Sequence, residues 1–210
     1  MIKNLIFGVI LTCLTTGLLL ASPEPSVVPK PGIWTLDVRF ENPEQIVLKG
    51  DNSQQRYWYI ILNLTNKSDK DVDFFPSCEL VTDTLQVVPA IKGTSSVLFD
   101  KIKTRHQGKY PFLQLIETAG VKMLQGEDNA LDIAVIFPDF DPNARTVNIF
   151  ISGLSNEIVA VDSPSEKDQD GNPAKILLRK TLQLTYSIAG DPKVRADQNL
   201  KLEDKRWVMR

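Results

Sequence analysis

The sequence predicts an all-β protein that folds as a two-sheet β-sandwich with extra edge strands and at most one short helix. About ten short runs rich in β-branched and aromatic residues follow one another with turn residues between them, which is typical of a sandwich or barrel. The run at residues 56–64 is apolar on both faces, as expected for a central strand that is covered on both sides. A hydrophobic content of 42% indicates a chain that folds around a core.

The first 21 residues have the features of a signal peptide. Met1–Asn4 is a short, positively charged start, residues 5–21 carry no charge, and the small residue Ala21 stands just before the expected cleavage point. A retained membrane anchor is the alternative, because the apolar run is at the short limit of a transmembrane span. No positive cluster follows the run as a stop-transfer flank, so we favour cleavage and export to the periplasm, the cell envelope or the medium.

A Pro-rich tether is expected over residues 22–32, between the leader and a single sandwich domain at residues 33–210. Four prolines within the tether favour an extended spacer over packed structure. Because Cys13 would leave with the leader, Cys78 would be the only thiol of the mature chain. An intrachain disulfide and a zinc site built on paired cysteines are then excluded.

Strands are expected through most of the first half of the domain. Trp34, Leu36 and Val38 alternate with polar residues, which is the period-2 pattern of a half-buried strand. Pro76 interrupts a later run, and a sheet accepts proline only at an edge or a bulge. The expected strands of this half are residues 33–40, 45–49, 56–64, 72–74, 78–82, 85–90 and 95–102.

One short helix is expected, at residues 112–119. Phe112, Leu115, Ile116 and Ala119 have the i, i+3, i+4, i+7 spacing of one helix face, between a proline start signal and a glycine stop signal. Strand patterns then resume. The expected elements of the second half are strands at residues 131–137, 146–151, 157–161 and 176–188, a polar loop at residues 163–173, and a final alternating segment with Trp207 and Met209 on one face.

Part of the first half resembles bacterial exported immunoglobulin-like modules, many of them uncharacterised. The resemblance lies within roughly residues 55–90 and is carried by residues 59–65, 72–74 and 78–83. In those modules a strand ends in Asn-x-Thr/Ser, the chain reverses, and a second strand leads to a Leu-x-x-Asp turn. Asn63 and Thr65 can hydrogen-bond the backbone where the strand leaves the sheet, whereas Thr84 stands where the modules often have Gly. The resemblance implies an immunoglobulin-like sandwich and no specific function.

The charge balance and the residue types argue against several classes of function. Lys+Arg 24 against Asp+Glu 26 gives a net charge of −2, which offers no general attraction for nucleic acid or anionic lipid. His106 is the only histidine, and neither it nor Cys78 stands in a recognisable nucleophile motif. A hydrolase that uses two carboxylates is left open, because residue types alone do not exclude it.

Two groups of residues are candidate contacts for a ligand or a partner. Tyr57 and Tyr59 share one face of a strand and could stack on a sugar or on a partner's surface, although a core role is favoured because the opposite face is apolar too. Leu154, Ser155 and Asn156 form a turn between two strands, where sandwich folds often place recognition loops. A purely structural hairpin is the alternative for this turn.

A weak calcium site is a further candidate, at Asp168 and Asp170. Carboxylates alternate from Glu166 to Asp170 and are followed by Gly171, like the beginning of a calcium loop. The twelfth position of that loop is Leu177 where Glu is required, so the helical form of the loop is excluded. An acidic turn at the surface is the favoured interpretation.

These observations favour an exported, non-enzymatic module that binds another protein or a surface component of the cell envelope. A carbohydrate-binding or small-ligand-binding domain is the first alternative, and a carboxylate hydrolase is the second. No cofactor, no nucleic-acid partner and no stable membrane span after cleavage are expected.

Overall fold

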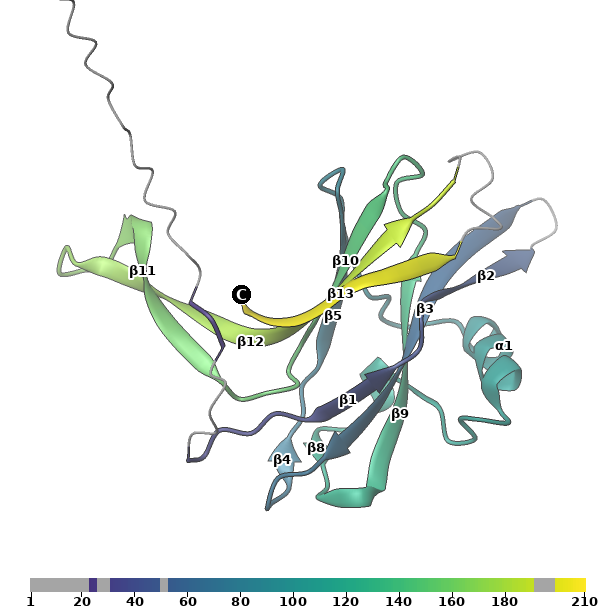
Figure 1. The fold of residues 1–210 in the computed structure, drawn as a ribbon, viewed down its shortest axis with the longest axis horizontal. Coiled ribbons are helices and arrows are strands. Elements are labelled where there is room, and N and C mark those ends of the chain that lie inside the picture. Colours follow the sequence, from purple (N-terminus) through teal and green to yellow (C-terminus); the bar gives the residue numbers. More distant parts are fainter. Residues whose placement is uncertain (1–22, 26–30, 50–52, 191–198) are drawn as a thin grey trace, which may run out of the picture.

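The computed structural model describes residues 23–25, 31–49, 53–190 and 199–210. The leader predicted over residues 1–21, and with it Cys13, lies outside the described residues, as does most of the tether predicted over residues 22–32. The described chain is mostly β, as predicted, and its strands form two main sheets with one α-helix beside them (Figure 1).

The first main sheet has β3 at its centre, and this strand contains the run predicted to be central. Its order is β1-β3-β9-β7, and β2 also pairs with β3. All pairs are antiparallel except β7 with β9, which is parallel. Its strands are β1 (Asp37–Phe40), β2 (Glu44–Lys49), β3 (Gln54–Asn66), β7 (Gln114–Leu115) and β9 (Gly126–Pro138).

The second main sheet has the order β11-β12-β10-β5-β6, and β13 also pairs with β12. A separate two-stranded sheet joins β4 (Val72–Asp73) to β8 (Lys122–Met123). The strands of the second main sheet are β5 (Ser77–Thr82), β6 (Val87–Pro89), β10 (Thr146–Ser152), β11 (Ile158–Lys167), β12 (Pro173–Ile188) and β13 (Leu200–Met209).

The two main sheets share one hydrophobic core. Trp58, Ile60 and Leu62 alternate along β3 and belong to the same buried cluster as Ile149 of β10 and Leu182 of β12. Full burial of such side chains contributes about 1.5–3 kcal/mol each, which is why the period-2 pattern determines which face of each strand turns inward. The central strands of both sheets therefore contribute side chains to the same buried cluster.

A helix covers the other face of the first sheet. α1 (Ser96–His106) buries Leu98 and Ile102, which belong to a second cluster with Tyr59 and Ile61 of β3. This explains why β3 is apolar on both faces. The strand predicted over residues 95–102 is therefore wrong. Leu98 and Ile102 are four residues apart, and this spacing places them on one face of a helix and also on one face of a strand, so it could not distinguish the two elements.

The helix predicted over residues 112–119 is also wrong. Phe112 is 79% exposed, so it is not part of a buried helix face. Leu115 pairs with Ala134 where β7 lies parallel to β9, and the helical content of the segment is a single 3-10 turn at Ile116–Thr118. Pairing with the open edge of β9 has overridden the helical spacing of the apolar residues.

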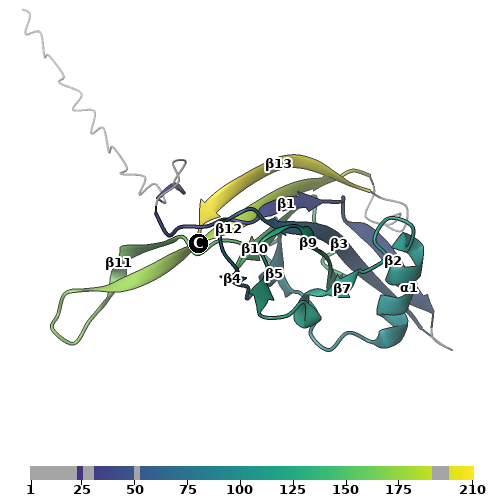
Figure 2. The same ribbon diagram turned by 90° about the horizontal axis from the view of Figure 1, so that it is seen from below.

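The polar loop predicted over residues 163–173 is mostly strand. β11 continues to Lys167 and β12 begins at Pro173, so only residues 168–172 form the turn between them. The hairpin that results extends well beyond the body of the protein (Figures 1 and 2).

Candidate functional site

The most exposed regular structure of the chain is the outer part of the hairpin formed by β11 and β12. We call residues 158–179 the β-arm. β13 pairs with β12 from Lys180 onward, and Arg210 after it bonds to Arg179. The residues of β12 before Arg179 pair with β11 alone. Figures 1 and 2 show that the arm, the outer end of the second sheet, projects away from the rest of the molecule. An isolated two-stranded hairpin is marginally stable in water and has no core of its own to bury apolar side chains.

Both faces of the β-arm carry aliphatic side chains. Residues that pair directly across an antiparallel ladder lie on the same face. One face carries the pairs Ile158/Arg179, Ala160/Leu177 and Asp162/Lys175, and the other carries Val159/Leu178 and Val161/Ile176. Leu177 is 59% exposed, Ile158 is 43% exposed and Ile176 is 40% exposed. The body alone therefore does not cover these side chains.

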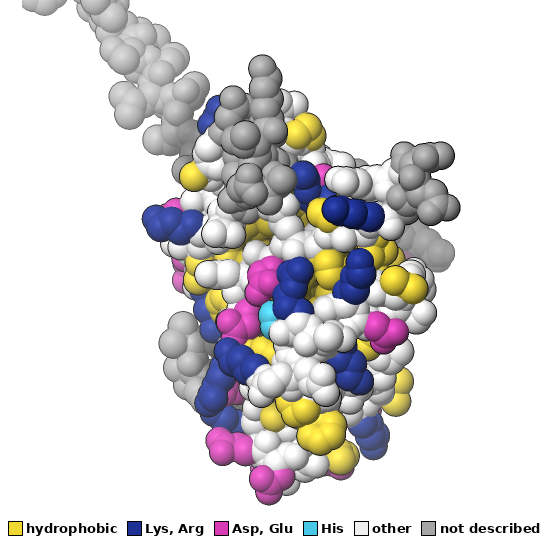
Figure 3. Space-filling model, turned by 90° about the vertical axis from the view of Figure 1, so that its right-hand side faces the viewer, with side chains coloured by type: hydrophobic (Ala, Val, Ile, Leu, Met, Phe, Trp, Pro, Cys, Tyr) yellow, Lys and Arg dark blue, Asp and Glu magenta, His cyan; other side chains and the backbone are white. Residues whose placement is uncertain are grey.

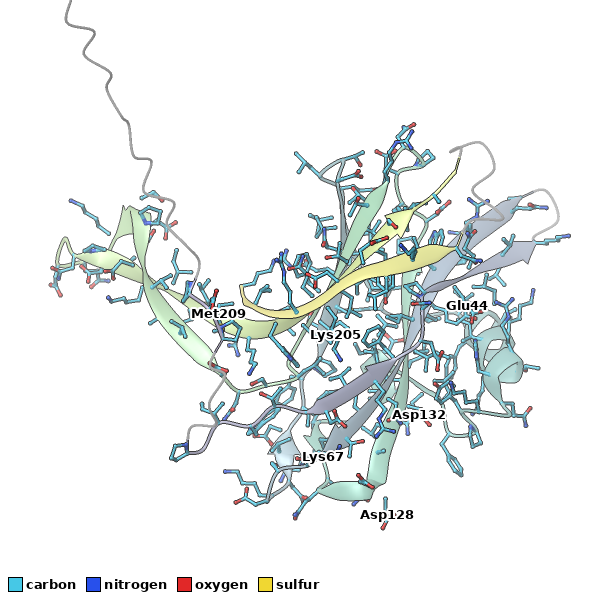
Figure 4. All side chains as sticks on the ribbon, in the orientation of Figure 1. Glu44, Lys67, Asp128, Asp132, Lys205 and Met209 are labelled. Atoms are coloured by element: carbon cyan, nitrogen blue, oxygen red, sulfur yellow. The ribbon has the colours of Figure 1, made fainter. Side chains whose placement is uncertain are left out.

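A buried ion pair holds the root of the β-arm. Lys180 Nζ lies 3.0 Å from Glu157 Oε2, and the two side chains are only 10% and 5% exposed. Lys180 Nζ also lies 5.4 Å from the centre of the Trp207 ring, and the Lys180 N–H donates to the Glu157 carbonyl. Figure 4 shows Met209, the ladder partner of Lys180, where the arm leaves the body. Charge, ring and ladder contacts thus fix the direction of the arm.

The tip of the β-arm contains the two residues of the predicted calcium site. The Asp168 carboxylate accepts the N–H groups of Asp170 and Asn172 at 3.0 and 2.9 Å. Gly171 has a φ of +85°, a conformation that glycine adopts without steric cost. Within the described residues, no three His, Cys, Asp or Glu side chains are grouped so that they could hold a metal ion. Asp168 thus acts in this structure as the residue that closes the turn.

The predicted recognition turn, Leu154 to Asn156, binds the beginning of the domain. The Trp34 N–H donates to Asn156 Oδ1 at 2.8 Å, and the Ser155 hydroxyl donates to the Trp34 carbonyl at 2.7 Å. Asn156 Nδ2 donates to the Gly32 carbonyl, and Leu154 is fully buried. The side chains that we considered for a partner are thus engaged within the chain.

The two tyrosines considered for sugar stacking lie on the face of β3 that α1 covers. Tyr59 is 1% exposed, and Tyr57 is half-buried against the same cluster. The Tyr59 hydroxyl lies 2.7 Å from Glu44 Oε2, 2.8 Å from His106 Nε2 and 3.1 Å from an Arg105 guanidinium nitrogen. Figure 4 labels Glu44, and Figure 3 shows the only histidine among acidic and basic side chains on this side of the molecule.

Hydrogen counting assigns the protons of this cluster. An ionised Glu44 only accepts and Arg105 only donates, so the single hydroxyl proton of Tyr59 goes to Glu44. His106 Nε2 must then carry a proton and donate it to the Tyr59 oxygen. Burial raises the pKa of Tyr59 far above its usual value, and the hydrogen bond to Glu44 adds to this. The cluster therefore keeps Tyr59 neutral and attaches the last turn of α1 to the sheet.

Removal of the Tyr59 hydroxyl tests this structural role. We expect Tyr59→Phe to lower the free energy of unfolding by about 1–2 kcal/mol, because Glu44, Arg105 and His106 lose a shared partner. Tyr57→Phe is the matched control, since the Tyr57 hydroxyl has no hydrogen-bond partner among the described residues, and we expect a change below about 0.5 kcal/mol. Urea unfolding followed by fluorescence measures both variants. Equal effects would contradict the anchoring role.

Cys78 is not placed for nucleophilic chemistry. It is buried and lines a cavity of about 230 Å³ together with Ile116 and Glu117. Burial raises the pKa of its thiol well above the usual range, so the thiol stays protonated at neutral pH.

The aliphatic residues of the β-arm were not singled out from the sequence. Their signal was the length of the run at residues 176–188, which is longer than the usual five or six residues of a strand. In this chain the strand that contains the run extends beyond β10 and β13 and pairs there with β11 alone. Whether other strands cover this extended part depends on residues far away in the chain, so the local sequence pattern does not predict it.

The described residues include no helix with the length and apolar character that a membrane span requires. Comparisons of this chain with protein-family models, with curated proteins and with solved structures find no match.

Proposed function

We propose that this chain is an exported, non-enzymatic module of the cell envelope, an immunoglobulin-like sandwich that binds another protein through the β-arm. The observation that carries the proposal is the exposure of aliphatic side chains on both faces of a projecting hairpin. Exposed apolar surface that the fold does not need for its own core is a mark of an interaction site. The signal peptide and tether predicted from the sequence support the envelope location.

The occupant that suits the β-arm is an extended strand of a partner protein. Lys180 and Glu157 form a hydrogen-bonded pair of the β11–β12 ladder, and such pairs alternate with non-hydrogen-bonded pairs. Leu177 and Ala160 form one of the non-hydrogen-bonded pairs, so their backbone N–H and C=O groups point away from each other, toward the two edges of the hairpin. On β12 the last residue whose outward groups are used is Arg179, which exchanges two hydrogen bonds with Arg210. The outward N–H and C=O groups of Leu177 and Lys175 come next along this edge of β12, on the side opposite β11. No described strand pairs with β12 on that side at these residues.

A strand added at this edge would gain both main-chain and side-chain contacts. Its backbone would continue the ladder that β13 ends, and its alternating side chains would lie beside the two aliphatic faces of the arm. Strand addition is therefore a better fit than a globular partner, which would cover one face of the arm and leave the other in water. Natural sheets usually protect such edges, so an apolar edge that no described strand covers favours an interaction site.

Site-specific photo-cross-linking in the native host tests the proposal. A photoreactive residue replaces Leu177 in one variant and Phe112 in the other, since Phe112 is also strongly exposed but lies beyond α1, away from the arm. We expect one envelope protein to be captured from position 177 and not from position 112. Equal capture from both positions would contradict the assignment of the interface.

Binding of the captured protein in purified form gives the decisive measurement. We expect Ile176→Thr combined with Leu177→Thr to weaken binding at least about tenfold, because two aliphatic contacts are lost while the strand propensity of the arm is kept. Phe112→Ser is the control and should leave the affinity unchanged. Unchanged affinity in the double variant, with an unchanged unfolding curve, would contradict the proposal.

A further inference from the structure

A groove lies on the outer face of the second sheet, at the root of the β-arm. It has a volume of about 340 Å³, and β5, β10, β12 and the residue after β13 contribute to it. Its lining residues are Ser77, Glu79, Phe150, Ser152, Arg179, Thr181 and Arg210. The sheet register brings them together, because Ser152 pairs with Ser77 and Arg179 is two residues from Thr181 on the same face.

The two arginines of the groove differ in their partners. Arg210 lies over the Phe150 ring at 4.1 Å and forms an ion pair with Glu79. Arg179 pairs with Arg210 through the backbone only, and among the described residues its guanidinium has no carboxylate partner. Two guanidinium groups and one carboxylate leave the groove with one positive charge, and that charge is on Arg179.

The remaining polar groups determine which anion fits. The hydroxyls of Ser152 and Thr181 already donate to backbone carbonyls, those of Ser77 and Arg179. The N–H groups of Arg179, the hydroxyl of Ser77 and the Arg210 N–H groups that do not face Glu79 are the donors left for a ligand. The guanidinium that no carboxylate neutralises, that of Arg179, suits a carboxylate, which it binds through two parallel hydrogen bonds. A doubly charged phosphate would be repelled by Glu79 without a second free cation to compensate.

The groove is continuous with one face of the β-arm. Arg179 is the ladder partner of Ile158, and Leu177 lies two residues away on the same face, about 6.6 Å along the strand. We propose that the groove binds a carboxylate of the partner segment that docks on the arm, two residues from an aliphatic side chain of that segment. The inference rests on the proposed function and names the chemistry of the partner. The carboxylate is either an Asp or Glu side chain or the end of the partner's chain.

Short peptides test the groove without the partner. The probes are Ac-Leu-Thr-Glu-NH2, which has a side-chain carboxylate, Ac-Leu-Thr-Leu-OH, which has a terminal one, and Ac-Leu-Thr-Gln-NH2, which has neither. The side-chain Nε–Hε signal of Arg179 is followed by NMR in the full chain. We expect it to shift saturably with at least one acidic peptide, at a Kd of about 1 mM as for a weak single-site contact, and not with the neutral peptide. The acidic peptide that binds identifies the source of the carboxylate.

Matched variants decide whether Arg179 is responsible. We expect Arg179→Gln to weaken the binding of the acidic peptide at least about tenfold, with reporter signals of Thr181 and Ser152 replacing that of Arg179. Lys103→Gln removes one positive charge from the exposed side of α1, outside the arm and the groove, and should leave peptide binding unchanged. Equal shifts with the neutral peptide, or binding that survives in Arg179→Gln, would overturn the inference. If the arm variants still lose the partner while no acidic peptide binds, the groove inference fails and the proposed function stands.

Discussion

Replacement of Gly153 by alanine is expected to destabilise the protein by about 3–5 kcal/mol, among the largest effects of any single methyl group in the chain. Gly153 has a φ of +80°, which L-residues other than glycine adopt only at a cost of about 1–2 kcal/mol. An added Cβ would also lie 2.3 Å from the Phe75 carbonyl oxygen and 2.9 Å from Pro76 Cα. Both are backbone atoms, so no side chain can rotate away to relieve the overlap.

Gly171→Ala separates the two components of this effect. Gly171 has a φ of +85°, and a Cβ added there meets nothing within 4 Å. We expect this variant to lose only the conformational part, about 1–2 kcal/mol. Guanidinium unfolding of the two variants gives the comparison, and the difference between them measures the contact with the chain at Phe75. Equal losses would show that the close approach of the two backbones relaxes freely.

The outcome at Gly153 also bears on the turn beside it. Leu154 and Ser155 hold residues 35 and 36 through the Leu36 N–H bond to the Leu154 carbonyl and the Thr35 bond to the Ser155 hydroxyl. A displaced turn would weaken these contacts with the edge of the domain. The turn-like sequence that suggested a recognition loop is therefore explained, in this structure, by a requirement for close packing.

The sequence pattern predicted the strands well where one face is buried. Trp58, Ile60 and Leu62 alternate because only one face of β3 meets the second sheet, and this periodicity is local information. The helix was missed because α1 is short and its buried stripe is only Leu98 and Ile102. The segment at residues 112–119 has a stronger helical spacing, but it lies at the edge of β9, and pairing along an edge depends on residues far away in the chain.

The candidate site was harder to predict than the fold. The Arg179 groove takes residues from four separate segments, and their approach is set by the ladder register, which the sequence does not reveal. The exposure of Leu177 likewise depends on which strands lie beside β12, and that is decided by residues far away in the chain. By contrast, the core role favoured for Tyr59 followed from a simple observation, the apolar residues on both faces of one strand, because only a covered central strand has that pattern.

Breaking the buried ion pair at the root of the β-arm should lower the free energy of unfolding far more than breaking the exposed ion pair farther along the arm. We expect Lys180→Met to lower the free energy of unfolding by about 3–5 kcal/mol, because it leaves the Glu157 carboxylate buried without its cation. Lys175→Met is the matched control. It breaks the ion pair between Lys175 and Asp162, whose side chains are 64% and 59% exposed, respectively. Exposed ion pairs contribute about 0–1 kcal/mol to stability. Urea unfolding of both variants tests the contrast, and similar losses would contradict it.

A second variant asks what the buried pair is for. In Lys180→Met combined with Glu157→Leu, both charges are replaced by apolar groups, and we expect most of the lost stability to return because no charge is left without a partner. If the pair also sets the direction of the β-arm, amide hydrogen exchange in residues 158–162 should stay faster in this double variant than in the native protein, although global stability has recovered. Native exchange rates at full stability would show that ladder contacts alone hold the arm. In that case the rigidity that strand addition needs comes from the backbone of β12 and β13, and the ion pair serves the core.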